Sequence, residues 1–243
     1  MTLAIVSAMP EELAALDAAL HTTRTEALGG RSWRFGRLGG EEVVLTLCGI
    51  GKVAAATTTA LLLDRFNVRA LLFTGVAGGL APGVNVGDVV VGRHFLQHDM
   101  DASPLFPRWE VPLTGRSHFA ADAAWAERLA GATARVLAAP HAGLAALGIS
   151  APRLHQGLIV SGDRFVSSAP ECAALRADLP EALAVEMEGA AIAQVCADFA
   201  RPFAVLRTIS DRADDQAHVD FPRFLREVAA QYSRDIVLAA LAS

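Results

Sequence analysis

Short apolar runs alternate with alanine-rich segments of helical period along almost the whole chain. Residues 3–7 form an apolar run that predicts a buried strand, and Pro10 with Glu11 and Glu12 has the form of a helix start, since proline and acids suit the first turn. Further strands are predicted at residues 33–38, 41–48, 70–75, 86–101, 154–162 and 202–210, and further helices at 52–66, 121–137, 169–177 and 221–241. This alternation is typical of βα units around a mostly parallel sheet, so we expect one α/β domain over residues 1–243.

Two segments depart from this alternation. Residues 33–38 and 41–48 flank Gly39 and Gly40, which predicts an antiparallel hairpin. Residues 103–119 are rich in proline and aromatic side chains and show no period, which predicts a long loop. A loop of that length in a compact domain tends to serve a function or to reach a partner.

Composition narrows the class of protein. Hydrophobic residues make up 53% of the chain and charged residues 19%, which favours helices on both faces of a buried sheet and leaves room for an oligomer interface. The formal net charge of -5 provides no basic stripe for a phosphate backbone, which argues against nucleic acid as a partner. The chain has no run of 18 apolar residues, and residues 1–12 lack the basic and long apolar regions of a signal peptide. We therefore expect a cytoplasmic protein without a membrane partner.

The spacing of cysteine, histidine and acidic residues does not favour a disulfide or a metal site. Cys48, Cys172 and Cys196 are odd in number, lack a CxxC spacing and lie in apolar segments, so we expect buried free thiols. The segments from His98 to Asp101 and from Asp211 to His218 both combine histidine with aspartate. Loops beside strands and helices collect acids for capping, so we expect structural roles there rather than metal binding.

Candidate chemistry gathers after predicted strands. Gly75, Gly78 and Gly79 follow one of them, where glycine lets backbone N–H groups approach a ligand, although the spacing matches no dinucleotide fingerprint. Asp211 follows another strand, and ligands of parallel sheets bind at the carboxyl ends of strands. Phe165 follows a third strand, where its ring either packs in the core or stacks on a flat heterocycle.

Residues 184–193, AVEMEGAAIA, place two acids in an apolar stretch. Side chains two residues apart in an extended segment point the same way, so Glu186 and Glu188 are expected to enter one cavity, with Met187 on the other face. Capping of a helix that begins at Gly189 accounts for one glutamate and leaves the other unexplained. The pair therefore indicates a functional site.

Seven short segments combine into one pattern: AMPEE, GIGKVAAA, FTGVAGGL, GDVVV, SGDRFV, AVEMEGAAIA and RTISDRAD. In order and approximate spacing they resemble the 5'-methylthioadenosine/S-adenosylhomocysteine nucleosidases, from Leu3 to the last predicted helix. The resemblance implies a nucleoside phosphorylase-like fold, in which a mixed sheet is partly closed into a barrel and surrounded by helices. It also implies a homodimer that uses water to cleave the N-ribosidic bond of 5'-thio-substituted adenosines, without a metal or organic cofactor.

The resemblance also implies roles for individual residues. Asp211 matches the general acid that protonates N7 of adenine, Glu12 matches the residue that orients and deprotonates water, and Glu188 matches the partner of the ribose hydroxyls. This division suits the chemistry, because cleaving the C1'–N9 bond makes the sugar cationic and the purine anionic. The remaining matches are expected to bind or support the substrate. Phe165 stacks on adenine, Val166 and Gly78 offer backbone contacts, and Ser210 and Glu186 support the acids. The apolar walls are formed by Met187, Met9, Ile50 and Phe221, and a wall position for Met187 requires the chain to leave ideal strand geometry there. The loop carrying Leu105 and Phe106 is implied to reach the neighbouring subunit's site.

Three other activities remain open. A nucleoside phosphorylase needs a cationic phosphate site after the first strand and before the glycine turn, and here those places lack arginine and carry Glu12 and Phe73 instead. An aminofutalosine hydrolase shares the adenine and ribose contacts and differs in the 5' pocket, where Arg108 and Trp109 depart from better-known family members. A non-catalytic adenine-nucleoside binder would be expected to lack one of the three acids, and all three are present.

Overall fold

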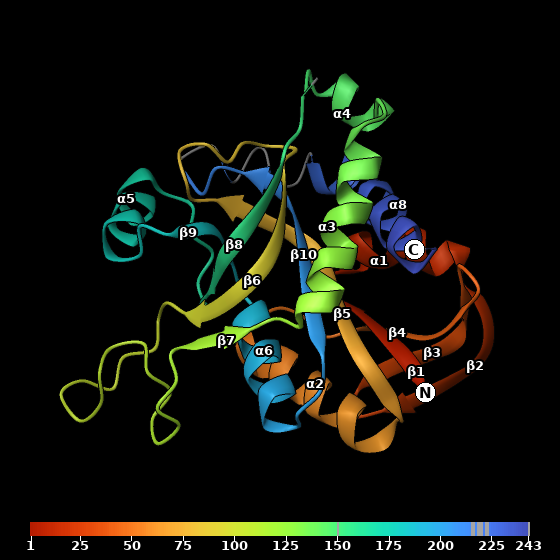
Figure 1. The fold of residues 1–243 in the computed structure, drawn as a ribbon, viewed down its shortest axis with the longest axis horizontal. Helices are drawn as coiled ribbons and strands as arrows, with labels where there is room; N and C mark the ends of the chain where they lie inside the picture. Colours follow the sequence, from red (N-terminus) through yellow and green to blue (C-terminus); the bar gives the residue numbers. More distant parts are fainter. Residues whose placement is uncertain (150, 215–216, 218–220, 222–223, 243) are drawn as a thin grey trace.

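One mixed β-sheet organises the protein (Figure 1). The computed structural model describes residues 1–149, 151–214, 217, 221 and 224–242. Within them the strands are β1 (Thr2–Ser7), β2 (His21–Leu28), β3 (Arg31–Leu38), β4 (Glu41–Leu47), β5 (Val68–Gly79), β6 (Val89–Gln97), β7 (His118–Ala120), β8 (Leu154–Ser161), β9 (Ala182–Glu186) and β10 (Phe203–Asp211). Strands β10, β6, β8, β9 and β5 pair in that order, and β5 also pairs with β10, so these five strands close a ring. Strands β1, β4, β3 and β2 extend the sheet beyond β5. The predicted mixed sheet with a partly closed barrel is therefore confirmed.

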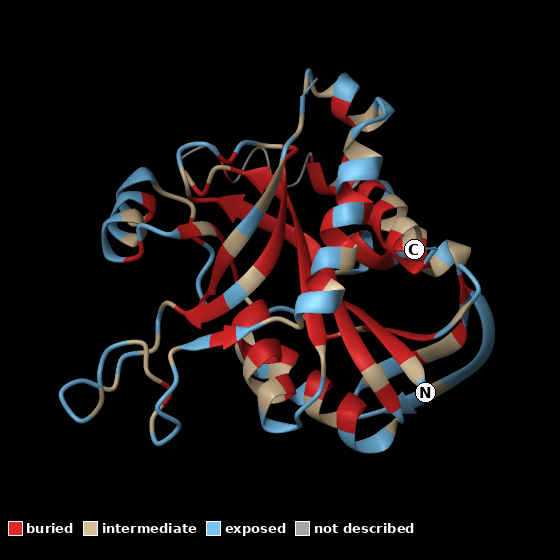
Figure 2. Cartoon of the chain, viewed as in Figure 1, coloured by how far each residue is buried: buried red, intermediate tan, exposed pale blue. Residues whose placement is uncertain are grey.

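Helices cover both sides of this sheet. They are α1 (Pro10–Ala19), α2 (Lys52–Arg65), α3 (Ala123–Leu137), α4 (Ala142–Ala146), α5 (Ala169–Asp178), α6 (Gly189–Asp198), the π-helical turn η1 (Leu225–Ala229) and α8 (Ala230–Leu241). Helices α1, α3 and α8 gather on one side, and α2 and α6 gather on the other (Figure 1). Because both faces are covered, β10 is buried along its whole length (Figure 2).

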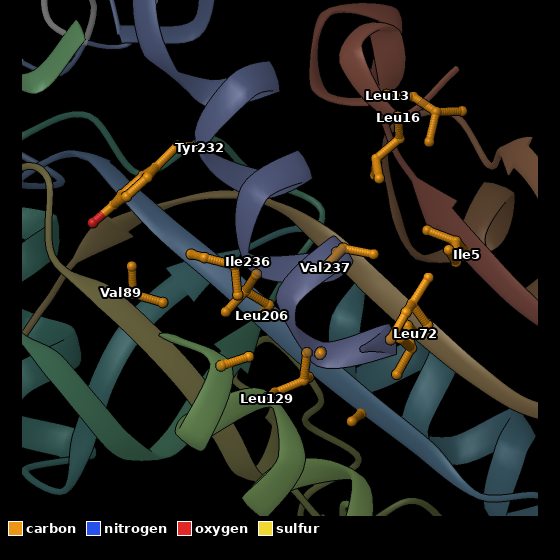
Figure 3. Packing of buried hydrophobic residues seen from close by; sticks show 14 of the residues in the cluster. Ile5, Leu13, Leu16, Leu72, Val89, Leu129, Leu206, Tyr232, Ile236 and Val237 are labelled. Carbon is orange, nitrogen blue, oxygen red and sulfur yellow. The ribbon is translucent and has the colours of Figure 1, made fainter. Parts of the chain in front are cut away.

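The core on the α8 side shows how this covering works. Ile236 and Val237 of α8 lie over Leu206 of β10 and Leu72 of β5 (Figure 3). Each of these four side chains is at most 1% exposed. Burying large aliphatic side chains in this way contributes roughly 1.5–3 kcal/mol for each. This packing fixes β5 and β10, whose carboxyl ends carry polar residues described below.

The predicted hairpin and the predicted long loop are both confirmed. Strands β3 and β4 pair antiparallel across Gly39 and Gly40. Between β6 and β7 the chain forms no helix or strand, apart from an isolated bridge between Val111 and Arg116. All three cysteines are buried free thiols, as expected. Among the described residues no helix is both long and apolar enough to span a membrane.

Several features of the strands differ from the prediction. Strand β7 overlaps the end of the predicted loop, and β6 is shorter than the strand predicted at residues 86–101. Strand β5 continues through Gly75 and Gly78 to Gly79, because β10 and β9 supply pairing partners there, so these glycines lie within the strand rather than after it. Strand β2 was not predicted, because its sequence, HTTRTEAL, is almost entirely exposed and shows no apolar alternation. Of the acidic cluster after β10, Asp215 and His218 lie outside the described residues.

Candidate active site

A cavity of about 520 Å³ lies at the carboxyl ends of β1, β5, β8, β9 and β10. This is the position at which open α/β sheets bind ligands. Its lining includes all twelve residues predicted as site residues, namely Met9, Glu12, Ile50, Gly78, Phe165, Val166, Glu186, Met187, Glu188, Ser210, Asp211 and Phe221. Ala8, Val76, Ala77, Arg164 and Val185 also line the cavity and were not predicted. Segments far apart in the sequence therefore meet at one place, while the roles of their residues remain predictions.

Glu12 lies in the first turn of α1, and its carboxylate turns back toward the start of the helix. Its Oε2 accepts hydrogen bonds from the backbone N–H groups of Ala8 and Met9, both at 2.9 Å, and its Oε1 accepts one from Val76 at 3.0 Å. Desolvation by burial raises the pKa of Glu12 above its ordinary value, against the opposing effects of the Arg207 charge and these N–H groups. A carboxylate with a raised pKa is a stronger base, which suits the removal of a proton from water.

Arg207 is a buried cation next to the cavity acids Glu186 and Glu188, and the sequence did not predict it. It lies in the middle of β10 with its side chain 1% exposed, donates a hydrogen bond from Nη2 to Glu186, and lies 3.5 Å from Oε2 of Glu188. Its guanidinium carbon lies 3.9 Å from the centre of the Phe73 ring. A buried cation needs such partners because losing its hydration is costly. The sequence signal for it is a single charged residue inside the predicted strand PFAVLRTIS.

The side chain of Glu186 is held by protein groups. Its two oxygens accept hydrogen bonds from the backbone N–H of Gly189 at 3.0 and 2.8 Å, and Oε2 also accepts one from the N–H of Glu188 at 3.1 Å. The Ser161 hydroxyl and Arg207 donate to it as well. Glu186 therefore caps the start of α6 although it also lines the cavity, so a structural role accounts for one of the two glutamates.

Glu188 directly precedes α6 and borders the cavity. Its Oε1 accepts a hydrogen bond from the backbone N–H of Gly51 at 2.9 Å. Desolvation by burial, followed by the charge of Glu186, raises the pKa of Glu188 to about 8, although Arg207 and the Gly51 N–H group lower it. The carboxyl group thus changes its charge near the pH at which most enzymes work.

We expect Glu188 to make the folded protein less stable as the pH rises. Its pKa of about 8 exceeds the ordinary value of 4.5, so the folded state binds this proton more tightly than the unfolded state. The resulting stabilisation is complete below pH 4.5 and is lost as the pH rises to about 8. Denaturant unfolding near these two pH values should therefore show a smaller loss of unfolding free energy in Glu188→Gln than in the unchanged protein. An equal loss in both proteins would contradict this assignment.

Asp211 ends β10 with its side chain turned to the cavity wall. Its Oδ2 accepts a hydrogen bond from the Ser210 hydroxyl and its Oδ1 accepts one from the backbone N–H of Ala213, both at 2.8 Å. Gly78 is its neighbour on β5, and a Cβ added to Gly78 would lie 2.9 Å from Oδ1 of Asp211. Only glycine lets the carboxyl group lie this close to the strand. These neighbours hold Asp211 in one orientation.

Apolar side chains form the remaining walls. Phe165 is 45% exposed, which excludes the core-packing alternative, and its ring lies edge-to-face with Phe221 at a centroid distance of 5.6 Å. Ile50, in the segment between β4 and α2, is also exposed and lines the cavity. Arg164, beside Phe165, forms an ion pair with Glu171. An exposed aromatic ring at a cavity lined by acids suits a flat heterocycle joined to a polar group.

Comparisons with known proteins match nearly the whole chain. A family model described as the phosphorylase superfamily matches residues 2–242. The 5'-methylthioadenosine/S-adenosylhomocysteine nucleosidase of Neisseria meningitidis, solved with methylthio-immucillin-A, is 38% identical, with a TM-score of 0.86, and the match covers 99% of this chain and 98% of that one.

Two further solved structures, also of 5'-methylthioadenosine/S-adenosylhomocysteine nucleosidases, have similar identities and TM-scores. The structure from Streptococcus pneumoniae, in complex with 8-aminoadenine, is 34% identical, has a TM-score of 0.86, and matches over 100% of this chain and 99% of that one. The structure from Colwellia psychrerythraea, in complex with adenine, is 35% identical, has a TM-score of 0.85, and matches over 99% and 94%. The similarity therefore extends to every segment that lines the cavity.

Proposed function

The chain belongs to the phosphorylase superfamily and within it to the 5'-methylthioadenosine/S-adenosylhomocysteine nucleosidases, and from this premise we propose that it hydrolyses the N-ribosidic bond of these two nucleosides. The products are adenine and the corresponding 5'-thioribose. The observation that carries the proposal is the meeting of three acids, Glu12, Glu188 and Asp211, at one cavity, each with different hydrogen-bond partners. An N-glycosyl hydrolase needs such a division, because one group protonates the leaving base and another activates water.

Asp211 acts on the base. As the C1'–N9 bond breaks, its electron pair moves into the purine, and the proton of Asp211 transfers to N7, so that adenine leaves as a neutral molecule. Phe165 stacks on the adenine ring, and the backbone of Val166 contacts its edge. Ser210 and Gly78 hold the carboxyl group of Asp211 in place.

Glu12 and Glu188 act on the sugar and the water. Glu188 accepts hydrogen bonds from the 2' and 3' hydroxyls, and its ionised form stabilises the cationic ribose that develops in the transition state. Glu12 removes a proton from the attacking water while the oxygen bonds to C1'. One water is consumed, the proton lost by Asp211 leaves with adenine, and exchange with solvent returns Glu12 and Asp211 to their starting states.

Apolar groups surround the 5' substituent. Met9, Ile50, Met187 and Phe221 all line the cavity, and we assign to them the contacts with the alkylthio group. A thioether is apolar and polarisable, so it gains from contact with methionine sulfur and aromatic rings. Glu186 supports Glu188 and does not bind substrate directly in this proposal, because protein donors occupy its oxygens.

A phosphate-dependent reaction is disfavoured by the charges at the cavity. Glu12 and Glu188 would repel a phosphate dianion at short range. Arg164, which lines the cavity, pairs with Glu171, and Arg207 pairs with the lining acids Glu186 and Glu188, so both cations already have acidic partners. Water is therefore the better nucleophile at this site.

We expect adenine release from 5'-methylthioadenosine to proceed at the same rate with and without inorganic phosphate, because no phosphate site takes part. Initial rates with phosphate, or with sulfate at equal ionic strength, measure this. The same assay on S-adenosylhomocysteine and aminofutalosine tests the alternative of an aminofutalosine hydrolase. The similar structures are of 5'-methylthioadenosine/S-adenosylhomocysteine nucleosidases, so we expect release from these two nucleosides rather than from aminofutalosine. A requirement for phosphate, or release from aminofutalosine alone, would refute the proposal.

We further propose a single domain over residues 1–243 that forms a homodimer in the cytoplasm and serves methionine salvage, without nucleic-acid or membrane partners. Leu105 and Leu113 of the long loop are 83% and 90% exposed in one chain, and Phe106 lies beside Leu105. Exposed apolar side chains on a projecting loop favour contact with another subunit. The loop would then carry Leu105 and Phe106 to the neighbouring site.

A further inference from the structure

Lys52, Asp99 and Asp163 form a cluster beside the cavity, which we call the clasp. The ammonium of Lys52 donates hydrogen bonds to Oδ1 of Asp99 at 2.6 Å and to Oε1 of Gln97 at 3.0 Å. Oδ2 of Asp99 accepts from the backbone N–H of Asp163 at 2.9 Å, and Oδ1 of Asp163 accepts from the backbone N–H of Lys52 at 2.7 Å. The contacts thus return to their starting residue and form a closed cycle.

The clasp joins three chain segments that meet only in the tertiary structure. Lys52 begins α2, Asp99 follows β6, and Asp163 follows β8. The first N–H groups of a helix have no partner within the helix, so those at the start of α2 are free to bind other groups. Gly51 donates to Glu188, and Lys52 donates to Asp163. Two consecutive N–H groups therefore bind a cavity residue and a clasp residue, respectively.

Both ends of the clasp lead directly into the proposed substrate site. Gly51, which binds Glu188, immediately precedes Lys52, and Phe165 lies two residues after Asp163. Gly51 has a φ of +96°, and a Cβ there would lie 3.1 Å from Oδ1 of Asp163, so glycine permits this close approach. A displacement at the clasp would move both the N–H donor of Glu188 and the ring that faces the base.

We propose that the clasp positions Glu188 and Phe165 relative to each other, and that Lys52, Asp99 and Asp163 are positioning residues for the ribose and base ends of one substrate. This inference rests on the proposed function. Preorganisation of this kind matters because a misplacement of about 1 Å at a reacting group costs on the order of 100-fold in rate. The three residues touch neither base nor sugar in the proposal, and they act through Gly51 and the segment that ends in Phe165.

The charges of the clasp favour its closed form. Partial burial raises the pKa of Asp99, but the hydrogen bonds from Lys52 and the Asp163 N–H outweigh this effect and hold the pKa below its usual value. Side chains of Lys52 and Asp99 are 16% and 32% exposed, so solvent screens this ion pair less than one on the open surface. Charged or titratable groups that face the clasp or Glu188 from neighbouring elements are His98, Glu186, Arg207, Glu12 and Cys48.

The test compares Asp163→Ala, Asp163→Asn and Lys52→Met with the unchanged protein, using 5'-methylthioadenosine across the pH range. We expect Asp163→Ala to lower kcat/KM by about 10- to 100-fold, because the start of α2 loses its anchor. Asp163→Asn keeps an oxygen for the Lys52 N–H and should recover most of that loss. Lys52→Met should also lower kcat/KM. In the double variant with Asp163→Ala, the loss should be smaller than the product of the two single losses, since both substitutions open the same cycle.

The pH profile separates positioning from a general effect on folding. The Gly51 N–H group lowers the pKa of Glu188, so loosening it should move the rising limb of kcat/KM to higher pH in Asp163→Ala. Glu41→Gln is the matched control, because it weakens another 2.6 Å ion pair of partial exposure, Glu41 with Arg69, away from the cavity. This control should retain the rate and pH profile of the unchanged protein.

Two outcomes would overturn the inference. Unchanged rates and an unshifted limb in folded Asp163→Ala would show that the clasp does not position Glu188. A lowered unfolding midpoint with an unshifted limb would assign these residues a purely structural role. Failure of the unchanged protein to release adenine would instead refute the proposed function, and the clasp with it, so the two failures are distinguishable.

Discussion

Replacing Asp211 by asparagine will leave the protein folded and slow adenine release from 5'-methylthioadenosine by about 1,000-fold or more. General acid help alone contributes on the order of 10²–10⁴-fold, and an amide has no proton of suitable acidity to give to N7. The amide keeps an oxygen for the Ala213 N–H group that now binds the carboxylate. Single-turnover measurements of free adenine, together with thermal unfolding, give the two quantities needed.

The matched control for Asp211 is Asp64→Asn, because Asp64 is an exposed acid in α2 that does not line the cavity. Its rate should equal that of the unchanged protein. Near-normal turnover in Asp211→Asn would remove Asp211 from the role of acid. A large loss accompanied by unfolding would show instead that the carboxylate holds the end of β10, and Asp211→Ser would then be compared at a temperature where both variants are folded.

Replacing Glu12 by glutamine will reduce hydrolysis by about 10²–10⁴-fold while ligand binding persists, because the amide cannot take a proton from water. The same substitution is also expected to lower the stability of the folded protein. The carboxylate accepts three backbone hydrogen bonds, and the NH₂ group of glutamine has to face at least one of those donors. Leaving a buried N–H group without an acceptor costs about 1–3 kcal/mol. Calorimetric titration with 5'-methylthioadenosine, adenine release and denaturant unfolding measure the three effects.

Glu11→Gln is the matched control for this substitution. Glu11 precedes Glu12 in the same helical turn, but its side chain is exposed. Its variant should bind, react and unfold like the unchanged protein. Folded Glu12→Gln that no longer binds the nucleoside would give Glu12 a role in binding, whereas full activity would exclude Glu12 as the base.

Local sequence predicts most of the elements that build this site. The first half of strand β10 is apolar because the strand is buried on both faces, and α2 shows helical period between Lys52 and Arg65. Strand β2 lacks such a signal because it is polar and exposed. Periodicity reports which face of an element is buried, so an element without a buried face escapes it.

The two glutamates of AVEMEGAAIA show the limit of local reasoning about the site. Their spacing and the family resemblance identify both as candidates, but no local pattern distinguishes their tasks. Folding brings Arg207, Ser161 and the start of α6 to Glu186, and it brings Gly51 to Glu188. Both glutamates line the cavity, and these partners decide that Glu186 caps α6 while Glu188 binds the segment before α2.

The sequence by itself determined the alternation of strands and helices, the family, and the identities of the acids at the strand ends. Only the tertiary structure decided the closure of β5 onto β10, the burial of Arg207 among carboxylates, the raised pKa values of Glu12 and Glu188, and the clasp. The physical reason is that desolvation and charge interactions depend on distances between residues far apart in the chain. Such distances exist only once the sheet has closed and its helices have packed on it.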